Sequence, residues 1–101
     1  MKIGKTKHSD GGHIKLTKYI NGVPAMLIVN NQGAVEMRAT VNLDLKPDEG
    51  CVFIKDYAEN EGVLKALEDA GAIELTGRVY RSGFVDIPEA KLLITQEQVN
   101  D

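Results

Sequence analysis

Apolar and polar residues alternate along much of the first half of the chain. Over residues 35–43 every second residue is apolar and the residues between are polar, a pattern typical of a strand with one buried and one solvated face. A similar alternation over residues 13–20 predicts another half-buried strand. Residues 25–29 are apolar throughout, so we expect a strand that is central or covered on both faces.

Two turns rich in asparagine and glycine connect these three segments. Asn21-Gly22 is typical of a two-residue hairpin turn, in which both central positions need positive φ. Residues 30–33, Asn-Asn-Gln-Gly, have the same turn chemistry. The three strands are therefore expected to form an antiparallel meander.

Helical spacing follows a fourth predicted strand over residues 51–57. Four apolar residues of the next segment occupy positions i, i+1, i+4 and i+7, which form one face of a helix: Val63, Leu64, Leu67 and Ala70. Asn60 is the expected N-cap, because its side-chain oxygen can accept a free amide of the first turn. Gly71 is expected to end the helix in the left-handed conformation.

Two further strands are expected after the helix. Residues 73–80 alternate again, and Gly77 predicts a bulge within them. A turn then leads to residues 84–87, which pair back before Pro88. Residues 90–94 either extend that strand or cover an edge of the sheet.

These patterns predict one α+β domain with a mostly antiparallel sheet, in the order β-β-β-β-α-β-β, and one helix packed on it. The domain is expected over residues 13–94. The lysine-rich residues 1–12 are interpreted as a flexible basic arm, and residues 95–101 as a polar tail.

Composition narrows the setting of this domain. A length of 101 residues suits one domain, and 43% apolar with 27% charged residues is ordinary for a soluble globular protein. No apolar run approaches the roughly 18 residues of a membrane span, and no apolar run follows the N-terminal lysines as in a secretory signal. A single cysteine, Cys51, fits a reducing compartment, so we expect a cytoplasmic protein.

Charge and aromatic content argue against direct nucleic-acid binding. The formal net charge is −3, whereas nucleic-acid-binding domains usually carry a basic excess. Three tyrosines, two phenylalanines and no tryptophan leave few side chains for base stacking.

The search for catalytic or metal-binding patterns favours a chain that is not an enzyme. His8, Asp10 and His13 could ligate a metal, but they lie on a glycine-rich segment that offers little to orient an imidazole. Cys51 is flanked by acidic and apolar residues, which favour a buried structural thiol over a nucleophile. Neither Ser9 nor Ser82 lies in a Gly-x-Ser-x-Gly motif. We therefore expect no catalytic residue, no metal and no cofactor.

An acidic cluster between the fourth strand and the helix has two interpretations. Asp56, Glu59 and Glu61 would lie near the positive end of the helix, where capping and dipole compensation explain them. They could instead form an acidic contact surface for a partner. Glu36 and Arg38, on the solvated face of the third strand, are the next candidate contact residues.

Part of the chain resembles a family of small uncharacterised proteins encoded by bacteriophages and other bacterial mobile elements. The similarity is best over residues 40–93 and is absent from residues 1–12. The matching segments are residues 52–62, Leu64, Ala66-Leu67, Ala70-Gly71, Thr76-Gly77-Arg78, residues 82–85 and residues 88–93. No catalytic residue can be transferred from this family.

The resemblance implies a small accessory protein made during infection or transfer of the element. On that basis we expect a non-enzymatic protein-interaction module that binds a host protein by steric occupation, with inhibition of a defence protein in the manner of an anti-CRISPR as the leading hypothesis. The alternative is a structural or accessory protein of the element that acts as a homo-oligomer.

Overall fold

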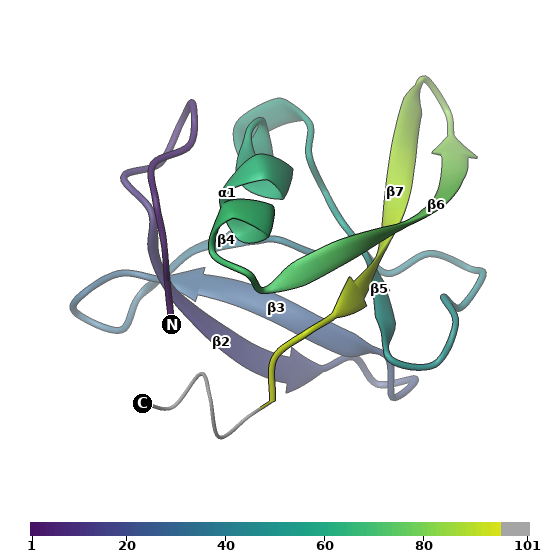
Figure 1. The fold of residues 1–101 in the computed structure, drawn as a ribbon, viewed down its shortest axis with the longest axis horizontal. Helices are drawn as coiled ribbons and strands as arrows, with labels where there is room; N and C mark the ends of the chain where they lie inside the picture. Colours follow the sequence, from purple (N-terminus) through teal and green to yellow (C-terminus); the bar gives the residue numbers. More distant parts are fainter. Residues whose placement is uncertain (96–101) are drawn as a thin grey trace.

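The computed structural model describes residues 1–95 as two antiparallel sheets and a short α-helix (Figure 1). The elements are β1 (Lys2–Ile3), β2 (Gly12–Lys18), β3 (Pro24–Val29), β4 (Val35–Arg38), β5 (Cys51–Phe53), the 3-10 helix η1 (Ala58–Asn60), α1 (Val63–Asp69), β6 (Ile73–Ser82) and β7 (Val85–Leu92). One sheet has the order β1-β2-β3-β4 and the other the order β5-β7-β6. The predicted α+β class, the antiparallel pairing and a single helix are confirmed for this part of the chain.

The sheet is divided in two, where the sequence suggested one. Beyond β4, an isolated antiparallel bridge pairs Thr40 with Ile54, and the Lys55 N–H donates to the Ala39 carbonyl (2.8 Å). This short contact connects the two sheets. β4 consequently covers only the first four residues of the strand predicted over residues 35–43.

The N-terminal residues differ from the expected basic arm, because they include a strand. β1 pairs with β2, and Ile3 is buried in the core. Gly11 and Gly12 allow this close approach: a Cβ atom on Gly11 would lie 2.4 Å from the Ile3 carbonyl oxygen, and one on Gly12 would lie 2.4 Å from the Val29 carbonyl oxygen. The glycine pair, interpreted from sequence as a loop signal, brings the first residues against the sheet.

The predicted meander is confirmed, with a different turn geometry. β3 lies between β2 and β4, as its apolar sequence indicated. The turn at Asn21-Gly22 is a three-residue loop, since the Tyr19 N–H donates to the Val23 carbonyl (2.9 Å) and the Gly22 N–H donates to the Tyr19 carbonyl (2.9 Å). Only Gly22 of these residues has positive φ, so the two-residue turn was wrong. Ile20, expected on the buried face, is fully exposed in this loop.

The loop between β3 and β4 repeats this arrangement. The Asn30 N–H donates to the Ala34 carbonyl (2.8 Å), the Gly33 N–H donates to the Asn30 carbonyl (2.9 Å), and Gly33 has positive φ. The expectation that both turns share one chemistry is therefore confirmed.

β6 and β7 form a long hairpin with the predicted bulge. Pairing shifts between Leu75 and Val79, and Gly77 has a φ of 90°. β7 continues through Pro88 to Leu92, so the C-terminal apolar residues extend the strand. A buried carboxylate, Glu89, supports the bulge: its Oε1 accepts the Thr76 hydroxyl (2.8 Å).

The core lies between the two sheets and α1. Val63 and Leu67 on the predicted helical stripe are fully buried, and Leu64 and Ala70 are partly buried against the same cluster. Buried residues come from both sheets and from the helix, for example Ile14, Val52 and Leu67. The helix therefore packs on the sheets as expected.

In residues 1–95, α1 falls far short of the length that a membrane-spanning helix would need. The predicted polar tail, apart from Thr95, lies outside the described residues.

Candidate functional site

Asp56, in the acidic turn, binds amides at the start of α1. Its Oδ1 accepts the N–H groups of Gly62 and Leu64, each at 3.0 Å. Free amides of the first helical turn need such acceptors, so Asp56 acts as the cap that the sequence assigned to Asn60. Asn60 is instead buried within η1, where its Nδ2 donates to the Arg38 carbonyl (2.6 Å).

The two glutamates of the turn are paired with lysines. Glu59 accepts a hydrogen bond from Lys55, which lowers the pKa of Glu59 and keeps the carboxylate charged. Glu61 forms an ion pair with Lys7 (3.0 Å). The charges of the turn are therefore compensated within the chain, and capping accounts for Asp56 without a partner.

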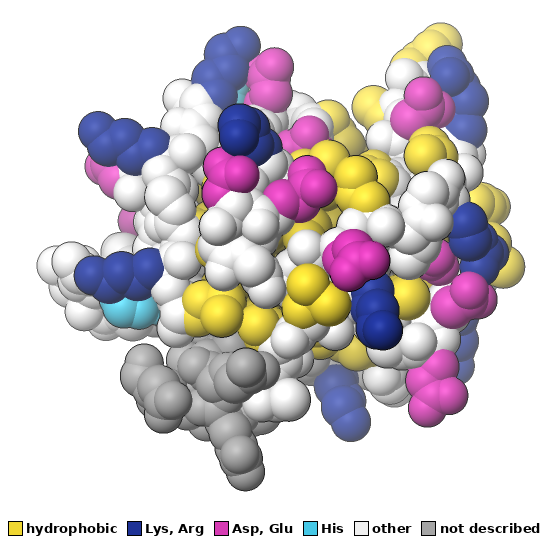
Figure 2. Space-filling model, viewed as in Figure 1, with side chains coloured by type: hydrophobic (Ala, Val, Ile, Leu, Met, Phe, Trp, Pro, Cys, Tyr) yellow, Lys and Arg dark blue, Asp and Glu magenta, His cyan; other side chains and the backbone are white. Residues whose placement is uncertain are grey.

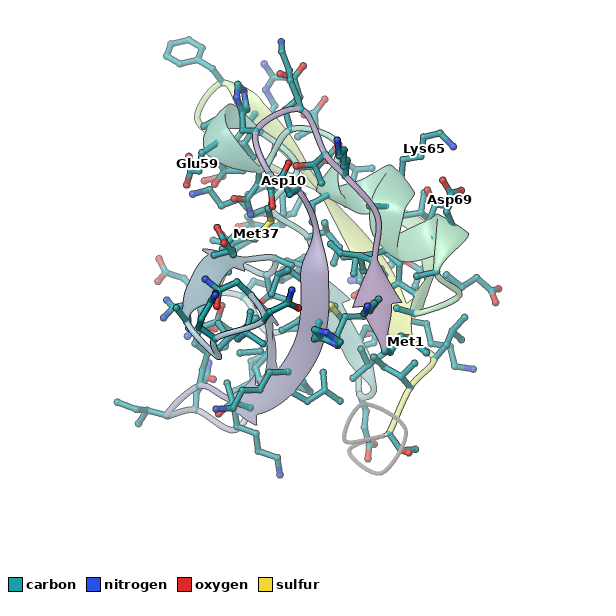
Figure 3. The ribbon with its side chains drawn as sticks, turned by 90° about the vertical axis from the view of Figure 1, so that its left-hand side faces the viewer. Met1, Asp10, Met37, Glu59, Lys65 and Asp69 are labelled. Carbon is teal, nitrogen blue, oxygen red and sulfur yellow. The ribbon has the colours of Figure 1, made fainter. Side chains whose placement is uncertain are left out.

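The two predicted contact residues on β4 lie in different surroundings. The backbone carbonyl of Arg38 accepts a hydrogen bond from the Asn60 side chain, which belongs to the acidic turn. Glu36 lines a hollow of about 440 Å³ beside the loop of residues 5–10. In Figure 3, Glu59 lies on the same side as Met37 of β4, whereas Lys65 and Asp69 lie together on α1. The structure thus connects Arg38 with Asn60 of the acidic turn, and places Glu36 and Glu61 beside the N-terminal residues.

Beside Arg38 the surface forms an open hollow of about 360 Å³ that sequence reasoning missed. We call it the tyrosine pocket. Its lining residues are Tyr19, Arg38, Thr40, Val41, Asn42, Lys55 and Tyr57. They come from the loop after β2, from the end of β4 and from the segment after β5, so no short motif in the sequence identifies them.

A second prominent surface is the outer part of the β6–β7 hairpin, residues 74–88, which we call the arm. All residues from 74 to 84 are exposed. Four of them are large and apolar: Leu75 (40% exposed), Val79 (60%), Tyr80 (38%) and Phe84 (99%). The arm extends beyond the body of the domain in Figure 1, and Figure 2 shows hydrophobic side chains along it and at its end.

The end of the arm is a tight turn that presents Phe84 to solvent. Ser82 pairs with Val85, which leaves Gly83 and Phe84 as the two central residues. Gly83 has a φ of 60° and Phe84 has no positive φ, the arrangement of a type II′ turn. A short hairpin of this kind holds Phe84 in a defined position.

The residues weighed for metal binding and nucleophilic chemistry have ordinary surroundings. Within residues 1–95 no three histidine, cysteine, aspartate or glutamate side chains are placed to hold a metal ion. Cys51 is buried, and burial raises the pKa of its thiol, with further increases from the carboxylates of Glu89 and Asp48. A raised pKa lowers the thiolate fraction and hence the nucleophilicity at neutral pH.

Comparison of the chain with protein-family models, with curated proteins and with solved structures finds no match.

Proposed function

We propose that this domain is a protein-binding module and that the arm makes the contact. The observation that carries the proposal is the exposure of Leu75, Val79, Tyr80 and Phe84 on one projecting hairpin. Large apolar side chains exposed along a projecting hairpin of a small domain are typical of interaction sites, and aromatic residues contribute strongly to binding energy. The domain would act by occupying a surface of its partner and would catalyse no reaction.

The arm offers two kinds of contact. Phe84 can enter an apolar pocket of the partner, where a buried aromatic side chain acts as an anchor. β6 lies at the edge of its sheet, so its free side can also accept an extended segment through backbone hydrogen bonds. The bulge around Gly77 interrupts this edge, which favours a short added segment over a long continuous ladder.

The resemblance to proteins of bacteriophages and mobile elements suggests a host protein as the partner, with inhibition of a defence protein as one outcome of the binding. A second copy of this chain is the alternative partner, because the exposed edge of β6 is available in every copy. The two cases differ in whether the purified protein associates with itself.

The test combines light scattering with affinity capture. Wild-type protein is passed over a sizing column at several concentrations, and is then used to capture proteins from a bacterial host lysate. The arm variant Val79→Ser/Phe84→Ser is compared with the control Ile20→Ser/Val35→Ser, which removes two similarly exposed apolar residues from the β2–β3 loop and from β4.

We expect the arm variant to lose the captured protein, or the self-association, while the control retains it. Equal retention by both variants would exclude the arm as the contact surface. The proposal would be overturned if the wild type is a monomer and if it captures the same proteins as both variants.

A further inference from the structure

We propose that the tyrosine pocket binds a carboxylate that is attached to a flat apolar group. The pocket shares no lining residue with the arm, and its ligand is separate from the protein partner proposed above. Among its lining residues, Arg38 and Lys55 are cationic and none is acidic.

Arg38 is the group that would hold the carboxylate. Its guanidinium has no ion pair and no hydrogen bond among the described residues, and no acidic residue lines the hollow around it. It lies over the Tyr19 ring, with 5.7 Å between the guanidinium carbon and the ring centroid. A planar guanidinium can donate two parallel hydrogen bonds to one carboxylate.

The position of Arg38 is set by the interior of the domain. The Tyr19 hydroxyl is hydrogen-bonded to Thr40 Oγ1 (2.9 Å), and Thr40 is 1% exposed. The Met26 N–H also donates to Thr40 Oγ1 (3.2 Å). On the other side, Asn60 binds the Arg38 carbonyl. Tyr19 is thus anchored to the core, the backbone of Arg38 is held by Asn60, and the guanidinium lies against the Tyr19 ring without a ligand, which would lower the entropic cost of binding.

The charged residues in and around the pocket leave one positive charge without a partner, which suits a ligand with one negative charge. Lys55 lies over the Tyr57 ring, with its Nζ 5.5 Å from the ring centroid, and is also paired with Glu59. Glu59 compensates Lys55, so Arg38 supplies the single uncompensated positive charge. A carboxylate carries one negative charge and matches this single cation, whereas the second charge of a phosphate dianion would have no uncompensated cation in the lining.

The remaining lining favours a flat apolar attachment. Tyr19 and Tyr57 contribute aromatic carbon to the lining, although Arg38 and Lys55 each lie over one of these rings, and Val41 adds an aliphatic side chain. The volume of about 360 Å³ lies in the range of small-ligand sites, which are roughly 300–1,000 Å³. An aromatic ring can pack against the tyrosines while its carboxylate meets Arg38.

Benzoate is the probe for the experiment, and binding is followed by two-dimensional NMR of the isotopically labelled protein. Three compounds are compared with benzoate. Acetate lacks the ring, benzamide lacks the negative charge, and phenyl phosphate carries a second negative charge. We expect benzoate to shift the amides of residues 38–42 and 55–57, and to bind more tightly than the three comparison compounds.

Arg38→Met should weaken benzoate binding by at least about tenfold, because a charge-assisted hydrogen bond is lost. Arg38→Lys should also weaken binding, since it keeps the charge but lacks the planar pair of donors. Arg81→Met on the arm is the control, and should bind benzoate as the wild type does. The Arg38 side chain is exposed, and the melting temperature of each variant confirms that it is folded.

Four results would overturn the inference. These are equal benzoate affinity in wild type and both Arg38 variants, shifts confined to another surface, benzamide or acetate binding as tightly as benzoate, and tighter binding of phenyl phosphate.

Discussion

Glu89 is a charged residue that is 1% exposed, and its contacts explain how it is accommodated. Its Oε2 accepts the Asp48 N–H (3.1 Å), its Oε1 accepts the Thr76 hydroxyl (2.8 Å), and Arg78 lies 3.7 Å from Oε2. Buried carboxylates require such partners, because an unpaired one would be strongly unfavourable. One side chain therefore joins the loop before β5, the bulge of β6 and the strand β7.

Glu89→Ala should reduce the free energy of unfolding by about 1–3 kcal/mol, because the Asp48 amide and the Thr76 hydroxyl lose their buried acceptor. Urea denaturation followed by circular dichroism measures the change. Glu74→Ala, at an exposed position of the same hairpin, is the matched control and should stay within about 0.5 kcal/mol of wild type. Similar losses in both variants would show that the contacts of Glu89 contribute little.

Some residue roles could be predicted from the sequence and others could not. The helical stripe through Leu67 and the bulge at Gly77 follow from local spacing and from glycine. The cap does not, because Asp56 is six residues from Gly62 and reaches the helix only after the chain turns through η1. The tyrosine pocket cannot be predicted from local spacing either. Strand pairing brings Tyr19, Arg38 and Tyr57 together, and a single sequence does not show which strands pair.

Among the elements, the two loops of the first sheet show that a sequence can give the position of a turn without giving its backbone geometry. Asn-Gly and Asn-Gln-Gly marked the positions correctly, since glycine is needed where φ is positive. Whether the loop has two or three residues depends on the register of the flanking strands. Lys18 pairs with Pro24, and the loop must then span one residue more than the sequence suggested.

Gly22 has a φ of 85°, and a Cβ atom there would meet no neighbouring atom, so its requirement is conformational. Gly22→Ala should therefore cost about 1–2 kcal/mol, the penalty of a left-handed conformation for an L-residue. Gly4→Ala is the control, because Gly4 lacks positive φ and is equally open. Chemical denaturation of both variants measures the difference, and equal stabilities would contradict the three-residue loop.

α1 is seven residues long and depends on a cap from outside the helix. Asp56→Ala should destabilise the domain by about 0.5–2 kcal/mol, as for loss of an N-cap side chain. Asp69→Ala removes a similar charge from the exposed end of the same helix, where Asp69 pairs with Lys65, and should change stability by less than about 0.5 kcal/mol. Thermal melts distinguish the two, and wild-type behaviour of Asp56→Ala would indicate that water serves these amides equally well.

At the scale of the whole molecule, both sheets depend on one core. The buried cluster includes Ile14 and Met26 of the first sheet, Val52 and Ala90 of the second, and Leu67 of the helix. We therefore expect the domain to unfold in one cooperative transition.

Leu67→Ala tests this expectation, because Leu67 is fully buried in the shared cluster. The loss of burial and the resulting cavity should cost about 2–5 kcal/mol. Amide signals of β2–β3 and of β6–β7, followed by NMR during denaturation, should lose intensity at the same lowered midpoint. The partly buried Leu64→Ala should cost less. Separate midpoints for the two sheets would mean that the core is not shared.

The arm has a consequence for how a chain of this kind can diverge. Residues 81–84 at the end of the hairpin are exposed, so side chains there are under little packing constraint, whereas nearer the body of the domain Thr76 binds Glu89 and Tyr80 lies against Phe53. If the arm makes the proposed contact, substitutions at the end of the hairpin can change the partner with little loss of stability, provided that Gly83 keeps the turn. Selection on binding and selection on folding would then act on largely different residues, and the arm could acquire a new specificity on an unchanged scaffold.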